Sequence, residues 1–251
     1  MQILSQALSK QIRQLHQKKF REKEKLFLTE GAKPVLELLE SDWKIRYLIG
    51  TEDFYAKAGL RTESLPAASF LCDEKILQST GTLETNRDAL AVVEIPEGIL
   101  RPDPGLPLWL VLDRLSDPGN LGTIIRLADW FGLTEIITTG QGVEWYNPKV
   151  INASKGSFLR VRQVKSEVGS ILKSGRALYT TGMNGSSLYD FQLPGGPMAL
   201  VIGQESHGIS EEWKIPGIES LSIPSFGKAE SLNAAMATGI LLNHWRYLLH
   251  T

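Results

Sequence analysis

Short apolar runs alternate with helical stretches along the C-terminal part of the chain. The runs are LWLVLD at 108–113, EIITT at 135–139, ALYTT at 177–181, MALVIG at 198–203 and LSIP at 221–224. Strands of a parallel sheet are covered on both faces, so they read as continuous apolar runs and do not alternate. The pattern predicts an α/β domain on a parallel sheet, in which ligands bind at the carboxyl ends of the strands.

The N-terminal part of the chain opens on a helical pattern. Leu4, Leu8, Ile12 and Leu15 are spaced as on one helix face and predict a helix over 4–23, and a second, shorter helix is expected from Gly31. Strand-like runs follow at 45–50, 68–72 and 89–96, with a helical segment at 73–80 before the last. We expect a small α/β domain.

A proline-rich segment separates the two patterns. Four of the twelve prolines fall at 96, 102, 104 and 107, close to Gly98 and Gly105. Proline fixes φ and removes a backbone donor, so such a stretch is typical of a semi-rigid linker. We therefore expect an accessory domain over 1–96, a linker over 97–106 and a second domain over 107–251.

The composition is that of an ordinary globular protein, with 42% hydrophobic and 22% charged residues. The single cysteine, Cys72, excludes an internal disulfide framework and a multi-cysteine zinc site, and it suits a reducing compartment. No signal-peptide pattern opens the chain, and no apolar stretch approaches ~18 residues. We expect a cytoplasmic protein with no metal and no membrane segment.

Basic residues are concentrated in two islands, although the net charge is −1. The first island, 10–25, includes Lys18, Lys19 and Arg21, and its net charge is +5. The second, 149–165, includes Lys155, Arg160 and Arg162, contains no acid, and also carries +5. Each island alone is compatible with a solvated surface. The two together favour localised contact with a polyanion such as RNA.

The loop GQESHGIS at 203–210 follows an apolar run and resembles a P-loop in the spacing of its glycines. Ile209 stands where the P-loop lysine belongs, and Glu205 would repel phosphates. A nucleotide-dependent enzyme therefore remains a weak alternative. No G-x-G-x-x-G pattern follows a strand, which argues against a dinucleotide-binding fold.

Two other segments share the design of a strand end, a glycine-containing loop and a helix. In the first, at 112–132, a helix follows the Asp117–Asn120 turn, and Arg126 falls off its apolar stripe. Such an arginine is either an ordinary surface residue or a group directed to a groove. In the second, at 223–247, Ser231 is expected to be the N-cap of the final helix.

These three segments, in this order, resemble the three motifs of the SpoU (TrmH-like) family of RNA ribose 2′-O-methyltransferases, within the SPOUT superfamily. The motifs are DRLSDPGNLGTIIRLADWFG, ALVIGQESHG and IPSFGKAESLNAAMATGI. The resemblance covers about 107–251, and ASKGSFLRV at 153–161 is similar to the family's segment between the first two motifs. The N-terminal part resembles the family's ribosomal-protein-like substrate-binding domain.

The resemblance implies a deep trefoil knot and a bent S-adenosylmethionine (AdoMet) bound in the knotted loops. Gly203, Ile223 and Leu232 match the positions that contact the cofactor. Five residues match the family's active residues, and they are Asn120, Arg126, Glu205, Ser231 and Asn233. Because a guanidinium keeps its proton, we assign Arg126 to stabilising the developing alkoxide and orienting a phosphate.

The substrate implied is structured RNA, with ribosomal RNA favoured over transfer RNA by the extra N-terminal domain. The alternative is a catalytically inactive RNA-binding or ribosome-assembly protein on the same fold. The intact set of polar site residues argues against that alternative.

The final helix, expected from about Ser231 to Leu249, is apolar on two sides. One stripe contains Leu232, Ala235, Met236, Gly239 and Ile240, and the other contains Ala234, Ala237, Leu241, Trp245 and Leu248. A helix that buries only one face has a broad polar side, whereas the polar side of this helix is narrow. Members of the family are similar to one another in pairing through this region. The second stripe therefore needs a cover, either more of the same chain or a second copy, and the resemblance favours a homodimer.

Overall fold

The computed structural model describes residues 1–60, 65, 68–98, 100–204 and 207–250. These residues form two compact units, one of residues 1–97 with 144–159 and the other of 98–143 with 160–251. The second stretch of the first unit therefore comes from well beyond the proline-rich segment. The linker expected over 97–106 therefore does not by itself separate the two units, because residues 144–159 also belong to the first one.

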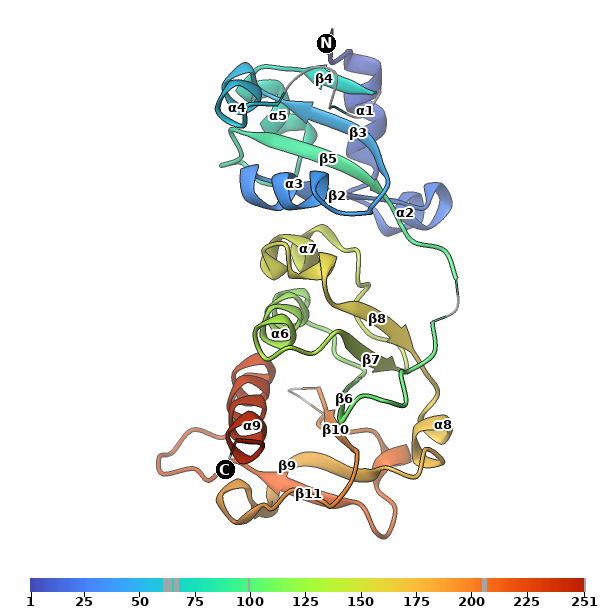
Figure 1. Ribbon diagram of the computed structural model, residues 1–251, viewed down its shortest axis with the longest axis vertical. Coiled ribbons are helices and arrows are strands. Elements are labelled where there is room, and N and C mark those ends of the chain that lie inside the picture. The colour runs from blue at the N-terminus through green and yellow to red at the C-terminus, as the bar shows by residue number, and fades with distance from the viewer. Residues whose placement is uncertain (61–64, 66–67, 99, 205–206, 251) are drawn as a thin grey trace. The chain divides into compact units, whose positions relative to one another are not determined.

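Unit 1 is built on a mixed sheet of five described strands, in the order β1-β4-β3-β5-β2 (Figure 1). The strands are β1 (Gln2–Ile3), β2 (Leu26–Glu30), β3 (Ile45–Gly50), β4 (Ser69–Leu71) and β5 (Ala89–Glu94). β5 is antiparallel to both β2 and β3, whereas β1, β3 and β4 are mutually parallel. The helices are α1 (Gln6–Gln14), α2 (Lys18–Glu24), α3 (Ala32–Leu39), α4 (Glu52–Lys57), α5 (Glu74–Thr80) and α7 (Pro148–Ser154), followed by the 3₁₀ helix η2 (Ser157–Leu159). The expected small α/β domain is confirmed.

Both faces of the unit 1 sheet are covered. Ile12 of α1 and Leu77 of α5 pack against Leu28 and Val92 on one face. On β2 the neighbouring Phe27 contacts the rings of Tyr146 and Phe158. The segment 144–159 thus supplies part of the core of unit 1.

The expected continuous helix over 4–23 is wrong. Helix α1 ends at Gln14, and α2 begins at Lys18 after an extended Gln17. The carbonyl oxygen of Leu15 accepts a hydrogen bond from Nη1 of Arg21 at 2.6 Å. A side chain thus satisfies a carbonyl that the helix leaves open at its end.

Unit 2 contains a six-stranded sheet, counted over the described residues, in the order β11-β9-β10-β6-β7-β8. Every neighbouring pair is parallel, as the apolar runs predict. The strands are β6 (Leu108–Asp113), β7 (Glu135–Thr139), β8 (Arg162–Lys165), β9 (Ala177–Ser187), β10 (Met198–Ile202) and β11 (Glu219–Ser222). The sequence analysis missed β8, an edge strand in which only Val164 is buried.

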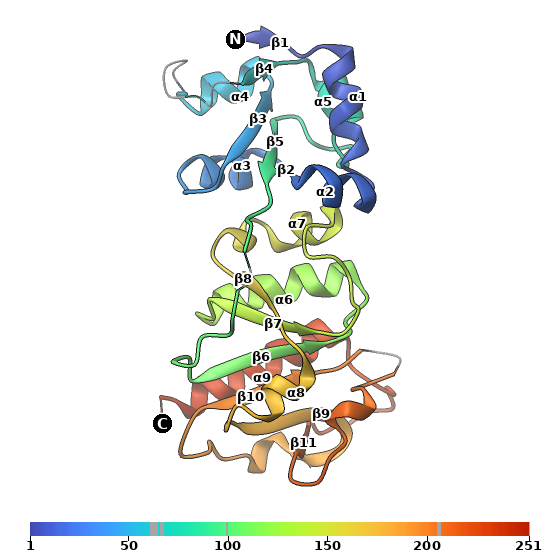
Figure 2. The same cartoon turned by 90° about the vertical axis from the view of Figure 1, so that its right-hand side faces the viewer.

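Helices cover the two faces of the unit 2 sheet. They are α6 (Pro118–Trp130), α8 (Val168–Leu172) and α9 (Ala234–Leu248), with the 3₁₀ helices η3 (Leu188–Asp190) and η4 (Glu211–Trp213). Helices α6 and α9 pack against each other on one face, and α8 lies in front of the other (Figure 2). Val168 of α8 and Trp213 of η4 join Val111 and Val201 in one core cluster.

The end of the proline-rich segment is fixed to unit 2. Indole Nε1 of Trp109 donates to the carbonyl of Asp103 at 2.8 Å, and Arg176 donates to the carbonyls of Pro104 and Leu106 at 2.7 Å each. The guanidinium of Arg176 lies 3.9 Å from the Trp109 ring centroid, and burial lowers its pKa. Residues 103–107 are therefore part of the folded unit.

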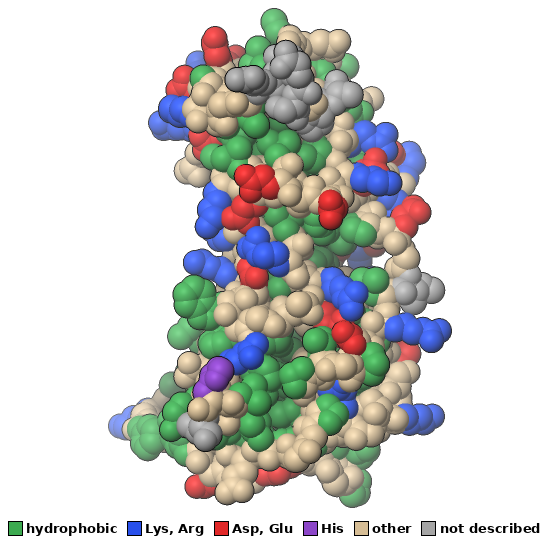
Figure 3. Space-filling model, viewed as in Figure 1, with side chains coloured by type: hydrophobic (Ala, Val, Ile, Leu, Met, Phe, Trp, Pro, Cys, Tyr) green, Lys and Arg blue, Asp and Glu red, His purple; other side chains and the backbone are tan. Residues whose placement is uncertain are grey.

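Unit 2 itself buries the second stripe of the final helix, the one expected to need a partner, and leaves part of the first stripe exposed. Ala234, Leu241 and Trp245 are buried within unit 2, so the chain itself covers most of the second stripe. The first stripe carries the exposed side chains, with Leu232 46%, Met236 63% and Ile240 37% exposed. Hydrophobic side chains gather on the face of unit 2 where α9 lies (Figure 3). No helix among the described residues is long and apolar enough to cross a membrane.

Candidate active site

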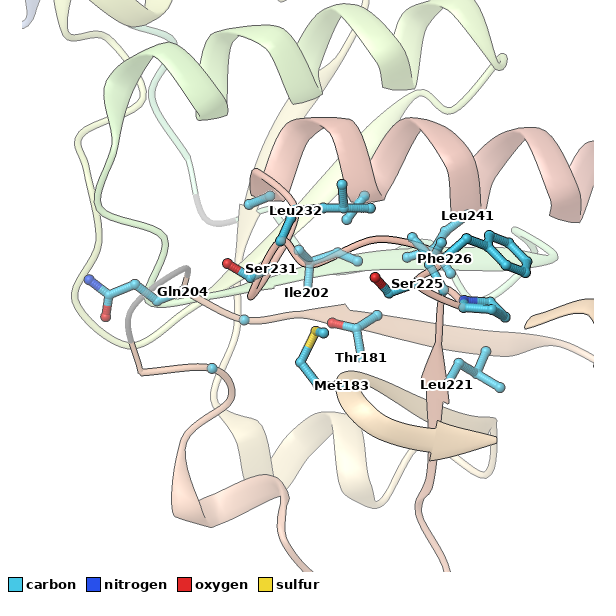
Figure 4. A pocket seen from close by; sticks show the side chains of 18 residues that line it. Thr181, Met183, Ile202, Gln204, Leu221, Ser225, Phe226, Ser231, Leu232 and Leu241 are labelled. Carbon is cyan, nitrogen blue, oxygen red and sulfur yellow. The ribbon is translucent and has the colours of Figure 1, made fainter. Parts of the chain in front are cut away.

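A pocket of about 360 Å³ opens beside the middle of β9 and at the carboxyl ends of β10 and β11. Its walls come from four segments: β9, the loop after β10, the loop after β11, and the start of α9. They contribute Thr181–Met183, Ile202–Gln204 with Gly208, Leu221 with Ile223–Phe226, and Ala229, Ser231, Leu232, Ala234, Ala237 and Leu241. The hydroxyls of Thr181, Ser225 and Ser231 lie around the same space (Figure 4). The lining is mainly apolar with a few polar groups, as in sites for small ligands and cofactors.

The structure brings the expected cofactor residues together. Gly203, Ile223 and Leu232 lie in three segments that are far apart in the sequence, and all three line this pocket. Ser231, expected among the active residues, lines it too. Thr181, Met183 and Phe226 are pocket residues that the sequence analysis missed. They lie at or just after the end of a predicted strand and in a loop, where a threonine or an apolar side chain does not by itself indicate a binding site.

The loop after β10 is closed by backbone hydrogen bonds. The amide of Gln204 donates to the carbonyl of Gly208 at 2.9 Å, and the amide of Gly208 donates back at 2.7 Å. A Cβ on Gly203 would lie 2.4 Å from the carbonyl carbon of Gly208, so only glycine fits there. Glu205, expected to be the carboxylate of the site, lies outside the described residues.

Asn120 and Asn233 meet between the first and third motifs. Nδ2 of Asn233 donates to Oδ1 of Asn120 at 2.7 Å. Oδ1 of Asn233 accepts from the amides of Ala235 and Met236 at 2.9 and 3.3 Å, so Asn233 is the N-cap of α9. The expectation that Ser231 is this N-cap is wrong, because the helix begins at Ala234.

Arg126 lies on the exposed side of α6. Leu121, Ile124, Ile125 and Ala128 are buried on the other side, as the helical pattern predicts. Arg126 does not line the pocket, and no ion pair joins it to any residue in the described part of the chain. Its charge therefore faces solvent on the helix that carries Asn120.

The first basic island divides into exposed and buried members. Lys18 and Lys19 are exposed on α2, whereas Arg21 is only 2% exposed. Arg21 pairs with Glu144 through two hydrogen bonds, and Nε lies 2.9 Å from Oε1. The assignment of Arg21 to RNA contact is therefore wrong, since its guanidinium is enclosed and neutralised within unit 1.

The second island is more accessible. Lys155 is exposed at the end of α7. Arg160 donates to both carboxylate oxygens of Asp129, at 3.1 and 3.0 Å from Nε, and Arg162 donates to Oε2 of Glu135 at 2.7 Å. About half of each arginine side chain is exposed. RNA contact by either arginine would compete with its carboxylate partner.

Known proteins resemble this chain over nearly its whole length. A model of the SpoU rRNA methylase family matches residues 107–243, and a model of the MRM3-like substrate binding domain matches 8–93. The 23S rRNA (guanosine(2553)-2′-O)-methyltransferase RlmP of Bacillus subtilis is 29% identical over 93% of this chain and 94% of its own. A 23S rRNA (uridine(2479)-2′-O)-methyltransferase of Streptomyces viridochromogenes is 32% identical over 86% of this chain and 80% of its own.

A solved structure agrees with these matches. The AdoMet-bound rRNA methyltransferase of Sinorhizobium meliloti superposes with a TM-score of 0.86 at 28% identity, covering 99% of this chain and 97% of that one. The resemblance drawn from the three motifs is thereby confirmed. The chain belongs to the SpoU rRNA methylase family of RNA 2′-O-methyltransferases, with an MRM3-like substrate-binding domain N-terminal to its catalytic domain.

Proposed function

We propose that this enzyme transfers a methyl group from AdoMet to a ribose 2′-hydroxyl of large-subunit ribosomal RNA, with AdoMet in the pocket beside β9 and at the ends of β10 and β11. The pocket carries the proposal, because Gly203, Ile223 and Leu232 converge on it from separate segments. The RNA assignment is supported by two relatives whose names specify 23S rRNA. With such a substrate, we propose a cytoplasmic location for the enzyme.

The pocket fits AdoMet in size and chemistry. Its volume of about 360 Å³ falls within the usual range for a cofactor site, ~300–1,000 Å³. Ile223, Leu232 and Leu241 would offer apolar surface to the cofactor, and the hydroxyls of Thr181, Ser225 and Ser231 would offer polar groups. When bound, AdoMet supplies an activated methyl group, and the protein supplies positioning.

The polar residues of the first and third motifs act on the RNA ribose. Asn120 and Asn233 are held together by their hydrogen bond, so α6 and α9 present them as one unit. Arg126 stabilises the negative charge that develops on the 2′-oxygen and orients a neighbouring phosphate, since a guanidinium stays protonated. Glu205 and Ser231 complete the set of active residues.

RNA binding falls to the exposed basic residues. Lys18 and Lys19, on α2 of unit 1, would contact RNA phosphates. In the second island, Lys155, Arg160 and Arg162 would do the same. Phosphate contacts fix the register of the RNA without reading its sequence. We assign residues 1–96 to RNA binding, and 107–251 to cofactor binding and catalysis with further RNA contacts from the second island.

We also propose that the enzyme is a homodimer. Met236 and Ile240 on α9, together with Leu232 just before the helix, form an exposed apolar surface that a second copy would bury. Leu232 also lines the pocket, so the interface would lie next to the cofactor. We further propose that the loops after β10 and β11 form the trefoil knot that the family resemblance implies.

The experiment is methyl transfer from radiolabelled AdoMet to purified 23S rRNA, 16S rRNA and transfer RNA, followed by mapping of 2′-O-methyl sites. We expect incorporation at a defined site in 23S rRNA. Incorporation only into transfer RNA would overturn the substrate assignment. RNA binding with neither AdoMet affinity nor methyl transfer would favour the inactive RNA-binding protein instead.

A further inference from the structure

The carboxylate of Asp113 joins three segments at the edge of the unit 2 sheet. Asp113 is the last residue of β6 and is only 1% exposed. Its Oδ1 accepts a hydrogen bond from Oγ1 of Thr139, at the end of β7, at 2.8 Å. Its Oδ2 accepts from the backbone amide of Ser210 at 2.7 Å. Ser210 follows the loop that closes one wall of the pocket.

A buried carboxylate is costly unless its oxygens are hydrogen-bonded. No ion pair joins Asp113 to a cation among the residues that the structure describes, and the neighbouring Arg114 pairs with Glu212 instead. The two donors, Thr139 and Ser210, therefore provide its stabilisation. A carboxylate that accepts from a backbone amide forms a stronger bond than a neutral acceptor does. The interaction is strong enough to hold one end of a loop.

A second contact holds the other end of the same loop. Nε2 of Gln204 donates to Oγ of Ser116 at 2.7 Å. Asp113 and Ser116 belong to the segment that leads into α6, where Asp117 caps the helix by accepting from the amide of Asn120 at 2.7 Å. Residues 113–120 thus contact the loop after β10 at both of its ends, at Gln204 and at Ser210, and they include Asn120.

We propose that Asp113 is a positioning residue for methyl transfer. Its bond to the Ser210 amide holds Gly208 and the residues next to it where they line the pocket, and keeps them in register with Asn120. This inference rests on the proposed function of the pocket. It predicts that AdoMet affinity depends on the hydrogen bond between Asp113 and Ser210, although neither residue lines the pocket.

Ser210 allows a sharp test, because its φ is −70°. Proline fits this φ and lacks the N–H, so Ser210→Pro deletes the donor to Asp113 with little change in backbone conformation. Ser210→Ala is the matched variant that keeps the N–H. We expect the Kd for AdoMet to be at least tenfold higher for the proline variant than for the alanine variant.

Asp113 itself gives a second comparison. Asp113→Asn retains an oxygen for the Ser210 amide and an NH₂ for the Thr139 hydroxyl, whereas Asp113→Ala loses both contacts. We expect AdoMet affinity within about threefold of wild type for the asparagine variant and a loss of tenfold or more for the alanine variant. The control is Gln163→Ala, which deletes the hydrogen bond from Gln163 to Thr138 at a neighbouring strand end.

Hydrogen exchange separates positioning from general destabilisation. In Ser210→Pro, the hydrogen-bonded amides of Gln204 and Gly208 should exchange faster, while those of β6 and β10 keep their protection. Equal AdoMet affinity for Ser210→Pro and Ser210→Ala would overturn the inference, and so would an exchange increase spread over the whole sheet. Wild-type protein that binds no AdoMet would instead refute the proposed function, so the two failures are distinguishable. If Asp113→Ala does not fold, the comparison at Ser210 still decides.

Discussion

The side chain of Asn233 caps α9 through its oxygen and donates through its nitrogen to Asn120, 113 residues earlier in the chain. The two functions can be separated by substitution. Asn233→Asp keeps the capping oxygen but places a second oxygen against that of Asn120, and Asn233→Ala loses both contacts.

We expect both variants to lose methyl transfer, but for different reasons. The alanine variant should also lose about 1 kcal/mol of unfolding free energy, as is usual when an N-cap is removed. The aspartate variant should unfold close to the wild-type temperature. Thermal unfolding beside a methyl-transfer assay tests this, and normal turnover by the aspartate variant would contradict it.

Arg126→Ala should abolish methyl transfer and leave AdoMet affinity within about twofold of wild type. The reason is that Arg126 does not line the pocket, and its assigned contact forms with the reacting ribose. Thr123→Ala, an exposed change one turn earlier on α6, serves as the control and should retain activity. Calorimetric titration with AdoMet and single-turnover methylation measure the two effects. Weakened AdoMet binding in Arg126→Ala would show that the arginine acts on the cofactor.

Replacing Lys18 and Lys19 by alanine should weaken RNA binding and reduce its salt dependence. Each lost phosphate contact should lower the slope of log K against log salt by about 0.7–0.9. Lys57→Ala removes an exposed lysine elsewhere in unit 1, where it pairs with Asp53, and should leave the slope unchanged. Filter binding at several salt concentrations measures the slope, and equal slopes for all variants would refute RNA contact by α2.

Arg21 requires a different prediction from its neighbours. Arg21→Ala would leave the mostly buried Glu144 carboxylate without its partner, so we expect a loss of about 3–5 kcal/mol of unfolding free energy. Chemical denaturation checks the value. A stable Arg21→Ala variant with weakened RNA binding would restore the original assignment of this residue.

The exposed stripe on α9 predicts a change of oligomeric state. Met236→Glu with Ile240→Glu should convert a dimer into a monomer at micromolar concentration, because two charges would be buried in the interface. Ser170→Glu, on the helix that covers the opposite face of the sheet, is the control. Sedimentation velocity distinguishes the states, and a monomeric wild type at all concentrations would exclude the dimer.

Cys72 should be slow to alkylate in the native protein. Burial, with a smaller contribution from the Asp73 carboxylate, raises the pKa of its thiol to about 11. Compared with a free thiol, the reactive thiolate fraction at pH 8 should be lower by about a hundredfold, and this protection is lost as the pH rises toward 11. Iodoacetamide labelling in buffer and in urea measures the difference, and equal rates in both would contradict the raised pKa.

The sequence predicted the parts of the fold that depend on local pattern. The five apolar runs became parallel strands because burial on both faces leaves a plain signal in the residues. Strand β8 left no such signal, because Arg162 and Lys165 are exposed and only Val164 is buried.

The candidate site was predictable from motifs, but the partners of individual side chains were not. Arg21 reads as one cation among seven in its island, and its burial depends on Glu144, which lies 123 residues away. For a similar reason, the sequence did not show that the first stripe of the final helix is the exposed one. Both stripes are apolar, and only the tertiary structure shows which is covered.

The sharing of residues 144–159 between the two halves of the chain limits how this protein can be divided or recombined. Tyr146 and Phe158 lie within the stretch matched to the methylase family, yet their rings pack on Phe27 of the N-terminal unit. A gene fusion that exchanged only residues 1–97 would leave those rings facing a foreign surface. Replacement of residues 1–97 therefore requires matched changes within 144–159, so the two segments are constrained to evolve together.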